Sequence, residues 1–349
     1  MLYLPPQVTT ALALLATAAL AVAALSHARF RAAAHHAAAH PPPGTRIVIV
    51  GASSGVGASL AVAYASRGCS LVLSARRTEQ LDAVQQQCVD AGAARVLVVA
   101  ADATDPVALR ALHDRAVAFF ASAPKSATAN EKGNEEEMVD RVVYCAGALT
   151  VCPFSATQRM RDEDAADLIN RVFAVNATAP ILLARVFWPS LRRAAEKRLT
   201  ANDSEDELVP PQPAFAIVSS AAGILPAPSR ALYCGAKAAL HGFFDALRIE
   251  ERREPCPVRV LLMAPGTILG TDLRATALDR GLWEDDMPTG TTRGGVPVDT
   301  VVAQMLAQVD DLVTVPAWYG VVRTVRTIAP DLIDWAAMRK YRTAPKSRS

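Results

Sequence analysis

The sequence has little net charge, few aromatic side chains and no cysteine or histidine grouping suited to a metal. Its 36 Lys and Arg residues against 34 Asp and Glu residues give a formal net charge of +2, too small to indicate nucleic-acid binding. The six cysteines include no Cys-x-x-Cys pair and no zinc-type spacing with histidine. We therefore expect no metal, no disulfide framework, and free thiols in a reducing compartment.

The scarcity of aromatic residues means that smaller side chains must form the core. Aromatic residues make up 5% of the chain and hydrophobic residues 51%, so alanine and the aliphatic residues carry the packing. A chain of 349 residues can bury a full core. The length fits one large α/β domain with extra segments as well as two small domains.

The N-terminal region contains a charge-free stretch from Val8 to Leu25, just long enough to cross a bilayer as a helix. Arg29 and Arg31 follow it, and the positive-inside rule then places the rest of the chain in the cytosol. A cleaved secretory signal is the alternative, although no positive charge precedes the apolar run. We predict a transmembrane helix within residues 1–30 and an Ala/His/Pro-rich linker over residues 31–44.

From Thr45 onward, short β-branched apolar runs alternate with helical patterns. This alternation predicts a Rossmann-type doubly wound parallel sheet, a three-layer α/β/α domain over residues 45–315. The expected strands are 46–50, 70–75, 95–99, 140–144, 214–218, 258–263 and 312–315. The expected helices are 58–67, 78–91, 106–120, 164–191, a helix from 233 that stops before 255, and 298–308.

Two polar segments, 122–137 and 196–213, interrupt this alternation and are predicted to be insertions at the sheet edge opposite the ligand crevice. Residues 271–296, rich in Gly, Thr and acidic side chains, are predicted to form a mobile lid. Substrate selectivity is expected to come from the segments 148–160, 224–232 and 267–297. The tail 316–349 mixes apolar and basic residues, which suits a membrane-surface segment, a dimer interface or a cover over the substrate channel.

A glycine-rich turn follows the first expected strand and opens a helix. Glycines let the backbone approach a pyrophosphate, and a helix N-terminus supplies free N–H groups and partial positive charge. The strand-turn-helix context makes this a dinucleotide site. Its predicted contacts are Gly51, Ser53, Ser54, Gly55, Val56 and Gly57.

The ends of the later strands extend the predicted cofactor site. Arg76 follows the second strand, where an acidic residue would bind the ribose of NAD and an arginine suits the 2′-phosphate of NADP(H), unless it is an ordinary surface arginine. Asp102 follows the third strand and is expected beside the adenine. Small residues after the fourth strand and at the end of the sixth are expected near the ribose and nicotinamide: Ala146, Gly147, Pro265, Gly266 and Thr267.

Tyr233 and Lys237 are four residues apart, so on a helix they share one face. A neighbouring ammonium favours the phenolate and lowers the tyrosine pKa from about 10. A shift of roughly three units would need about 4 kcal/mol and would make Tyr233 an acid usable near neutral pH. Ser220 ends the preceding strand, and Asn176, a polar residue in an apolar run, either caps a backbone group or holds a water. On its own, however, Tyr-x-x-x-Lys often occurs by chance.

Taken together, the chain resembles the short-chain dehydrogenase/reductase superfamily over residues 45–315, in the ordered motifs Gly51-x-x-x-Gly55-x-Gly57, Ala146-Gly147, Asn176, Ser220 and Tyr233-x-x-x-Lys237. The resemblance implies that Tyr233 protonates the substrate oxygen during carbonyl reduction. It further implies that Lys237 lowers the tyrosine pKa and binds the nicotinamide ribose, together with Tyr233. Ser220 would hydrogen-bond the carbonyl, and Asn176 would position a proton-relay water. Val50 and Tyr144 depart from the family pattern, at scaffold positions.

The N-terminal segment, Ala75-Arg76-Arg77 and Arg323 to Pro330 are similar to the membrane-bound dehydrogenase/reductase member 7B branch. That similarity implies a lipid reductase of the endoplasmic reticulum or peroxisome with its catalytic domain facing the cytosol, acting on a lipid-like carbonyl or alcohol such as acyl- or alkyl-dihydroxyacetone phosphate. Steroid and ketosphinganine reductases share this plan and stay open. The superfamily resemblance also suggests a homodimer. The contrasting hypothesis is a catalytically silent, NADP(H)-binding interaction protein at a membrane.

Overall fold

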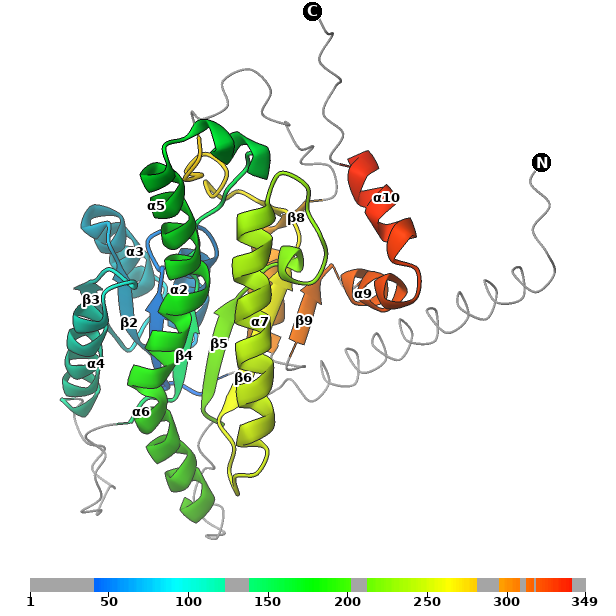
Figure 1. Cartoon of the computed structure of the whole chain (residues 1–349). Helices are drawn as coiled ribbons and strands as arrows, with labels where there is room; N and C mark the ends of the chain where they lie inside the picture. The colour runs from blue at the N-terminus through cyan, green and yellow to red at the C-terminus, as the bar shows by residue number, and fades with distance from the viewer. Residues whose placement is uncertain are drawn as a thin grey trace, which may run out of the picture.

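The computed structural model describes residues 41–122, 138–201, 212–280, 295–307, 312–316 and 318–340. A single seven-stranded sheet lies at its centre, with every neighbouring pair of strands parallel (Figure 1). The strands are β1 (Arg46–Val50), β2 (Ser70–Ala75), β3 (Arg95–Ala100), β4 (Arg141–Tyr144), β5 (Ala214–Val218), β6 (Arg259–Pro265) and β9 (Leu312–Val315). A separate small parallel pair joins β7 (Ile268–Leu269) and β8 (Val296–Pro297).

Helices connect the strands along the chain. The α-helices are α2 (Gly55–Ala65), α3 (Thr78–Asp90), α4 (Pro106–Ala121), α5 (Asp162–Phe173), α6 (Ala179–Ala201), α7 (Ala231–Glu251), α8 (Val298–Ala307), α9 (Trp318–Ile328) and α10 (Pro330–Lys340). Three short elements accompany them: the 3₁₀ turns η2 (Phe154–Arg159) and η4 (Ala221–Gly223), and the π-helical segment η3 (Ala174–Thr178).

The strand order, β3-β2-β1-β4-β5-β6-β9, confirms the predicted doubly wound sheet. The chain starts at β1, moves outward to β3, and then returns to place β4 on the other side of β1. In such a sheet the switch point between the first strand and its return neighbour opens a crevice at the carboxyl ends of the strands. Val50 lies in register with Ser74 and Tyr144, so the segments that follow β1, β2 and β4 meet at that edge.

Both faces of the sheet are covered, which gives the three layers. Because strand side chains alternate between faces, Ile47 and Ile49 join the core cluster with α2, α3 and α8. Val48 and Val50 join the opposite cluster with α4, α6 and α7. These four side chains are buried, which explains why residues 47–50 form an uninterrupted apolar run.

Most element boundaries agree with the sequence expectations to within two or three residues, and two differences matter. Strand β6 continues to Pro265, two residues beyond the expected end, so this residue belongs to the sheet edge itself. Helix α6 runs to Ala201, so the polar segment 196–201 continues a helix and the expected start of the second insertion is wrong. The described residues exclude 123–137 and 202–211, where the rest of the two insertions lies.

Among the residues that the structure describes, one helical stretch, Asp162–Leu199, is long and apolar enough to cross a membrane, with a mean hydropathy of 1.4 in its most apolar window. Half of that window is buried, and α6 contributes Leu183 and Phe187 to the sheet-facing core. A core helix satisfies the same criterion. The predicted N-terminal transmembrane helix lies outside the described residues.

The two C-terminal helices, α9 and α10, lie beside the β9 edge of the sheet (Figure 1). Tyr319 of α9 lies so close to Gly266 that a side chain on the glycine would overlap the tyrosine ring. Arg326 donates to the backbone oxygen of Ile224 at 3.3 Å. Helix α9 therefore contacts the loops that follow β5 and β6, on the ligand side of the sheet.

Candidate active site

The glycine-rich turn after β1 is closed so tightly that two of its positions must be glycine. Gly51 has a φ of 84°, and a Cβ there would overlap the backbone of Ala146 after β4. A Cβ at Gly57 would overlap the carbonyl of Gly51. Gly55, the first residue of α2, also has a positive φ, 56°. Bare backbone at a helix N-terminus is what a dinucleotide pyrophosphate requires, so this turn fits such a cofactor.

An arginine that the sequence did not single out contacts this turn. Arg77 donates to the hydroxyl oxygens of Ser53 and Ser54 at 2.9 and 2.7 Å. It precedes the first residue of α3, and the Arg-Arg pair after β2 was the available signal. Arg76, which the sequence predicted would bind the 2′-phosphate, instead has its Nη1 3.8 Å from Oδ2 of Asp102. Its side chain is 74% exposed.

Asp102 is held by local hydrogen bonds at the end of β3. Its Oδ1 accepts from the backbone N–H and the hydroxyl of Thr104 at 2.9 and 2.7 Å. Burial raises the pKa of Asp102, but these two bonds and the charge of Arg76 outweigh that effect and lower it. The carboxylate therefore stays ionised at the edge where the adenine was expected.

Ser220 and Tyr233 meet at the carboxyl edge of β5. Ser220 precedes the turn η4, and its Oγ accepts from the Ala222 N–H at 3.1 Å. The same hydroxyl donates to the carbonyl of Pro265 at 3.5 Å. Tyr233 is 5% exposed, and the nearby Ser220 hydroxyl acts to lower the pKa of its phenol. The structure thus brings together the two groups that the sequence predicted would contact a carbonyl oxygen.

Lys237 lies one helical turn beyond Tyr233 and is 2% exposed. Its Nζ donates to the backbone oxygen of Val218 at 3.3 Å and lies 5.8 Å from the centre of the Tyr233 ring. Burial lowers the pKa of Lys237 to about 8, and the nearby Cys145 opposes that change slightly. The ammonium is therefore present at neutral pH in a site that has little water to solvate it.

The pKa of Tyr233 moves in the direction opposite to the sequence expectation. Burial raises it, and the hydrogen bond with Ser220 and the charge of Arg230 only partly oppose that effect. Desolvation of the phenolate therefore outweighs stabilisation by the neighbouring groups. In this arrangement the phenol keeps its proton at neutral pH, which suits a proton donor better than a base.

Asn176 uses its whole amide group to hold the backbone. It sits fully buried in the π-helical segment η3. Its Nδ2 donates to the carbonyls of Ala148 and Val172 at 2.7 and 2.9 Å, and its Oδ1 accepts from the Ala148 N–H at 3.2 Å. Of the two roles that the sequence left open, this geometry is the backbone-capping one.

Tyr144, a departure from the family pattern, supports the same segment. Its hydroxyl donates to the carbonyl of Val175 at 2.6 Å, and its side chain is fully buried. A π-helical turn disturbs the regular hydrogen-bond ladder, and this bond satisfies one of the affected carbonyls. The substitution therefore keeps the β4 edge tied to Asn176.

The remaining predicted cofactor positions lie at the same carboxyl edge. Gly147 lies near Asn176: a Cβ on Gly147 would be 3.5 Å from Oδ1 of Asn176. The Gly266 N–H donates to Val315 at 2.8 Å, and the Thr267 carbonyl accepts from Val296 at 2.9 Å. Val56 is buried in the first turn of α2 and Pro265 at the end of β6.

Two of the three segments expected to determine the substrate, 148–160 and 267–297, converge next to Tyr233. Leu149, Val151 and Ala277 pack around its ring in one apolar cluster. Asp279 joins two of the segments, since it accepts from the Val151 and Cys152 N–H groups at 2.9 and 2.7 Å. The start of the predicted lid is thus attached to the loop after β4; residues 281–294 are not among those described.

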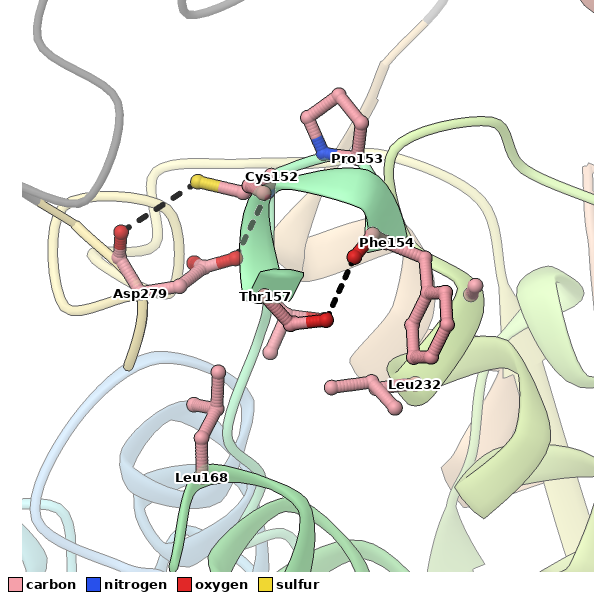
Figure 2. A pocket seen from close by; sticks show the side chains of 10 residues that line it. Cys152, Pro153, Phe154, Thr157, Leu168, Leu232 and Asp279 are labelled. Carbon is pink, nitrogen blue, oxygen red and sulfur yellow. Dashed lines mark hydrogen bonds between the residues drawn. The ribbon is translucent and has the colours of Figure 1, made fainter. Parts of the chain in front are cut away.

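A small pocket opens beside this cluster, between Cys152, Phe154, Leu232 and Asp279 (Figure 2). Its cavity volume is about 10 Å³, which is roughly the space for one water molecule. Phe154, 55% exposed, lies at the pocket and offers an apolar surface to solvent.

Comparison with known proteins identifies the family that this fold and site define. The family model described as short chain dehydrogenase matches residues 45–201 and 213–280. The chain belongs to this family, the short-chain dehydrogenase/reductase superfamily, whose members are oxidoreductases with a nicotinamide cofactor.

Individual relatives narrow the comparison. The chain is 27% identical to 11-beta-hydroxysteroid dehydrogenase A of Arachis hypogaea, over 86% of this chain and 77% of the relative. It is 28% identical to an 11-beta-hydroxysteroid dehydrogenase of Pinus massoniana, over 84% and 72% of the two chains. Among solved structures, an alcohol dehydrogenase of Thermococcus sibiricus complexed with 5-hydroxy-NADP matches with a TM-score of 0.57 at 18% identity, covering 77% of this chain and 95% of the other. At that identity, the structural match supports the fold alone.

Proposed function

We propose that this protein is an NADP(H)-dependent reductase that converts a lipid-like carbonyl to an alcohol, or catalyses the reverse oxidation, at a membrane. The observation that carries the proposal is the group formed by Ser220, Tyr233 and Lys237 at the sheet edge next to the glycine-rich turn. Such a group holds a proton donor where a bound cofactor and a carbonyl would meet.

The chain's own residues account for the proton side of the reaction. When bound, the nicotinamide supplies a hydride to the carbonyl carbon. Tyr233 donates its proton to the carbonyl oxygen, which Ser220 holds by a hydrogen bond, so that the carbonyl gains one hydride and one proton. The buried Lys237 ammonium stabilises the phenolate that remains and is placed to bind the ribose hydroxyls. These contributions are orientation and proton supply.

The preference for NADP(H) is supported by two adjacent arginines after β2. Arg77 already contacts the serines of the glycine-rich turn, and Arg76 extends from the same edge. A guanidinium matches the geometry and charge of a 2′-phosphate. No acidic side chain takes the position directly after β2, where NAD-binding folds of this kind use one.

The lipid-like substrate is supported by the apolar surroundings of Tyr233 and by the names of the relatives. Leu149, Val151 and Ala277 would contact a substrate that reaches the phenol. Several relatives are called 11-beta-hydroxysteroid dehydrogenases, which puts a steroid first among the candidates. Ketosphinganine and acyl- or alkyl-dihydroxyacetone phosphate follow it.

The proposed setting is the cytosolic face of the endoplasmic reticulum or peroxisome, with the N-terminal apolar segment as the anchor. Helix α9 contacts the loops on the substrate side, which supports a cover over the substrate channel. Membrane contact and a homodimer interface are further proposed roles for the tail.

The catalytic assignment is tested by Tyr233→Phe, which removes the proton donor and keeps the ring. We expect turnover to fall by roughly 10³-fold or more, on the scale of lost general acid catalysis, while NADPH binding is retained. NADPH oxidation and fluorescence titration measure the two quantities. Equal turnover in the variant would contradict the assignment, and a wild type that binds NADPH without any turnover would favour the silent interaction protein.

The cofactor assignment is tested by Arg77→Ala, with Arg76→Ala beside it. Loss of one charge-assisted contact to a phosphate should weaken NADPH affinity by roughly tenfold. Affinity for NADH should change little, because it lacks that phosphate. Unaltered NADPH affinity in both single variants and the double variant would refute the assignment.

A further inference from the structure

A buried histidine lies directly behind the catalytic groups. His241 follows Lys237 by one turn and Tyr233 by two turns on α7, and it is 7% exposed. Its Nε2 lies 2.9 Å from the hydroxyl oxygen of Ser219. The backbone of Ser220 lies close enough to raise the pKa of the imidazole. His241 therefore contacts the two residues that directly follow β5.

The turn that carries Ser220 is seated on this histidine. A Cβ at Gly223 would lie 2.7 Å from Cδ2 of His241 and 2.9 Å from the carbonyl carbon of Lys237. The turn η4 thus packs on α7 with no space for even a methyl group. Since Ser220 leads into η4 and its Oγ accepts from the Ala222 N–H, the imidazole and the bare glycine together set where the Ser220 hydroxyl stands.

The protonation state of His241 matters because it decides whether Nε2 accepts from the Ser219 hydroxyl or donates to it. A neutral imidazole can accept at one nitrogen and donate at the other, whereas an imidazolium only donates. Burial lowers the pKa of His241 below 6.5, and the charges of Lys237 and of Arg323 in α9 act in the same direction. The charge of Asp245 on the same helix and the backbone of Ser220 oppose this change. The neutral form therefore predominates at neutral pH.

We propose that His241, in its neutral form, is a positioning residue that holds the Ser219–Gly223 turn and thereby aligns the Ser220 hydroxyl with the Tyr233 phenol. The proposal deepens the proposed reductase function and rests on it for its kinetic consequences. It adds that acid should disturb the alignment, because an imidazolium would donate to Ser219 and force that hydroxyl to reorient.

Two substitutions at position 241 separate hydrogen bonding from titration. His241→Phe keeps a planar ring of similar volume and removes its polar contacts. His241→Gln reaches Ser219 with an amide and does not titrate in this pH range. His113 offers a matched control. Its Nε2 lies 2.9 Å from Ser190 Oγ, and this contact joins α4 to α6, away from the catalytic turn. His113→Phe therefore removes a similar bond without involving the catalytic turn.

We expect His241→Phe to lower kcat by roughly 10- to 100-fold with little change in NADPH affinity, since misplacement of a group by about 1 Å costs rates of this order. His241→Gln should recover most of that loss. It should also lack the fall in kcat that we expect of the wild type on acidification below pH about 6.5. His113→Phe, corrected for its folded fraction, should keep wild-type kcat.

A spectroscopic readout makes the result independent of turnover. In protein labelled with ¹³C-tyrosine, the Tyr233 signal is assigned by its loss in Tyr233→Phe. His241→Phe should shift this signal, His241→Gln should return it towards the wild-type position, and His113→Phe should leave it in place. A Tyr233 signal that is the same in all variants, or equal kcat in His241→Phe and His113→Phe, would overturn the proposal. If the wild type showed no turnover while His241→Phe still altered the Tyr233 signal, the proposed function would be refuted and the positioning role would remain supported.

Discussion

At the scale of single residues, the buried ammonium of Lys237 lowers the stability of the fold. Its side chain is almost completely removed from water, and its Nζ donates a hydrogen bond to the backbone carbonyl of Val218. Burial lowers its pKa from 10.5 to about 8. A base whose pKa is lower in the folded state binds fewer protons there than in the unfolded state, so between pH 8 and 10.5 stability rises with pH.

Lys237→Met should therefore stabilise the fold while it abolishes turnover. Below pH 8 the wild type carries the full cost of the buried charge, on the order of 3 kcal/mol for a shift of this size. The variant should be more stable by about that amount at pH 7, and the difference should shrink as pH rises towards 10.5. Urea unfolding at pH 7 and at pH 10.5 measures it. If Lys237→Met and the wild type had equal free energies of unfolding at both pH values, the description of Lys237 as a buried cation would be contradicted.

The sequence was enough to predict which residues lie together where their spacing along the chain is short. Tyr233 and Lys237 share a helix face, and Ser220 lies two residues after the preceding strand, so local geometry brings them together. His241, Arg77 and Asp279 were not singled out, because their partners are fixed by the tertiary fold. The pKa of Tyr233 was predicted in the wrong direction, since the sequence does not show how completely the fold buries the phenol.

At the scale of elements, the active site depends on the contact between the turn η4 and helix α7. Gly223 allows this contact because it has no side chain. Helix α7 also contains Gly242, where a Cβ would meet nothing within 4 Å. The two glycines therefore offer a comparison between a crowded and an open position on neighbouring parts of the structure.

Gly223→Ala should displace η4 from α7 and lower both stability and kcat. Overpacking of this kind costs roughly 1–3 kcal/mol. Gly242→Ala should instead stabilise the helix by about 0.5–1 kcal/mol, because alanine has the higher helix propensity, and should keep wild-type kcat. Thermal unfolding and steady-state kinetics test both. If Gly223→Ala behaved like Gly242→Ala, the close packing of η4 on α7 would be wrong.

Element boundaries were predictable where an apolar β-branched run had clear ends, as in β1, β2, β5 and β9. The π-helical segment η3 was not, because its amino-acid pattern continues that of α5 and α6. Long-range bonds accompany it: Asn176 donates to the carbonyl of Ala148, and Tyr144 donates to the carbonyl of Val175. A polar residue in an apolar run was the available signal, and it indicated a bonding role without indicating the π geometry.

At the scale of the whole molecule, the alternation of strands and helices was enough to predict the doubly wound sheet and the edge where the site lies. A cover over the substrate channel was one of the roles that the sequence left open for the tail. The particular contacts of α9 with the loops after β5 and β6 were not predictable, since the tail carries no motif that indicates its partner. The membrane anchor stays a prediction, because residues 1–40 lie outside the described part of the chain.

Deletion of residues 1–30 tests that anchor. The shortened protein should move from the membrane pellet to the soluble fraction and still bind NADPH, because the described domain starts after this segment. Carbonate extraction followed by immunoblotting measures the distribution. Retention of the deleted form in the pellet would contradict an anchor in this segment, and release by high salt would then indicate attachment through basic residues.

The central claim, that Tyr233 supplies the proton while a nicotinamide supplies the hydride, has a direct test. Membrane-reconstituted protein is given NADPH deuterated at its transferable hydrogen, together with a ketosteroid, ketosphinganine and acyl-dihydroxyacetone phosphate. The account predicts deuterium on the carbinol carbon of at least one product, and roughly 10³-fold less of it with Tyr233→Phe. Product that lacks deuterium, no product from any of the ketones, or equal labelling by the variant would contradict it.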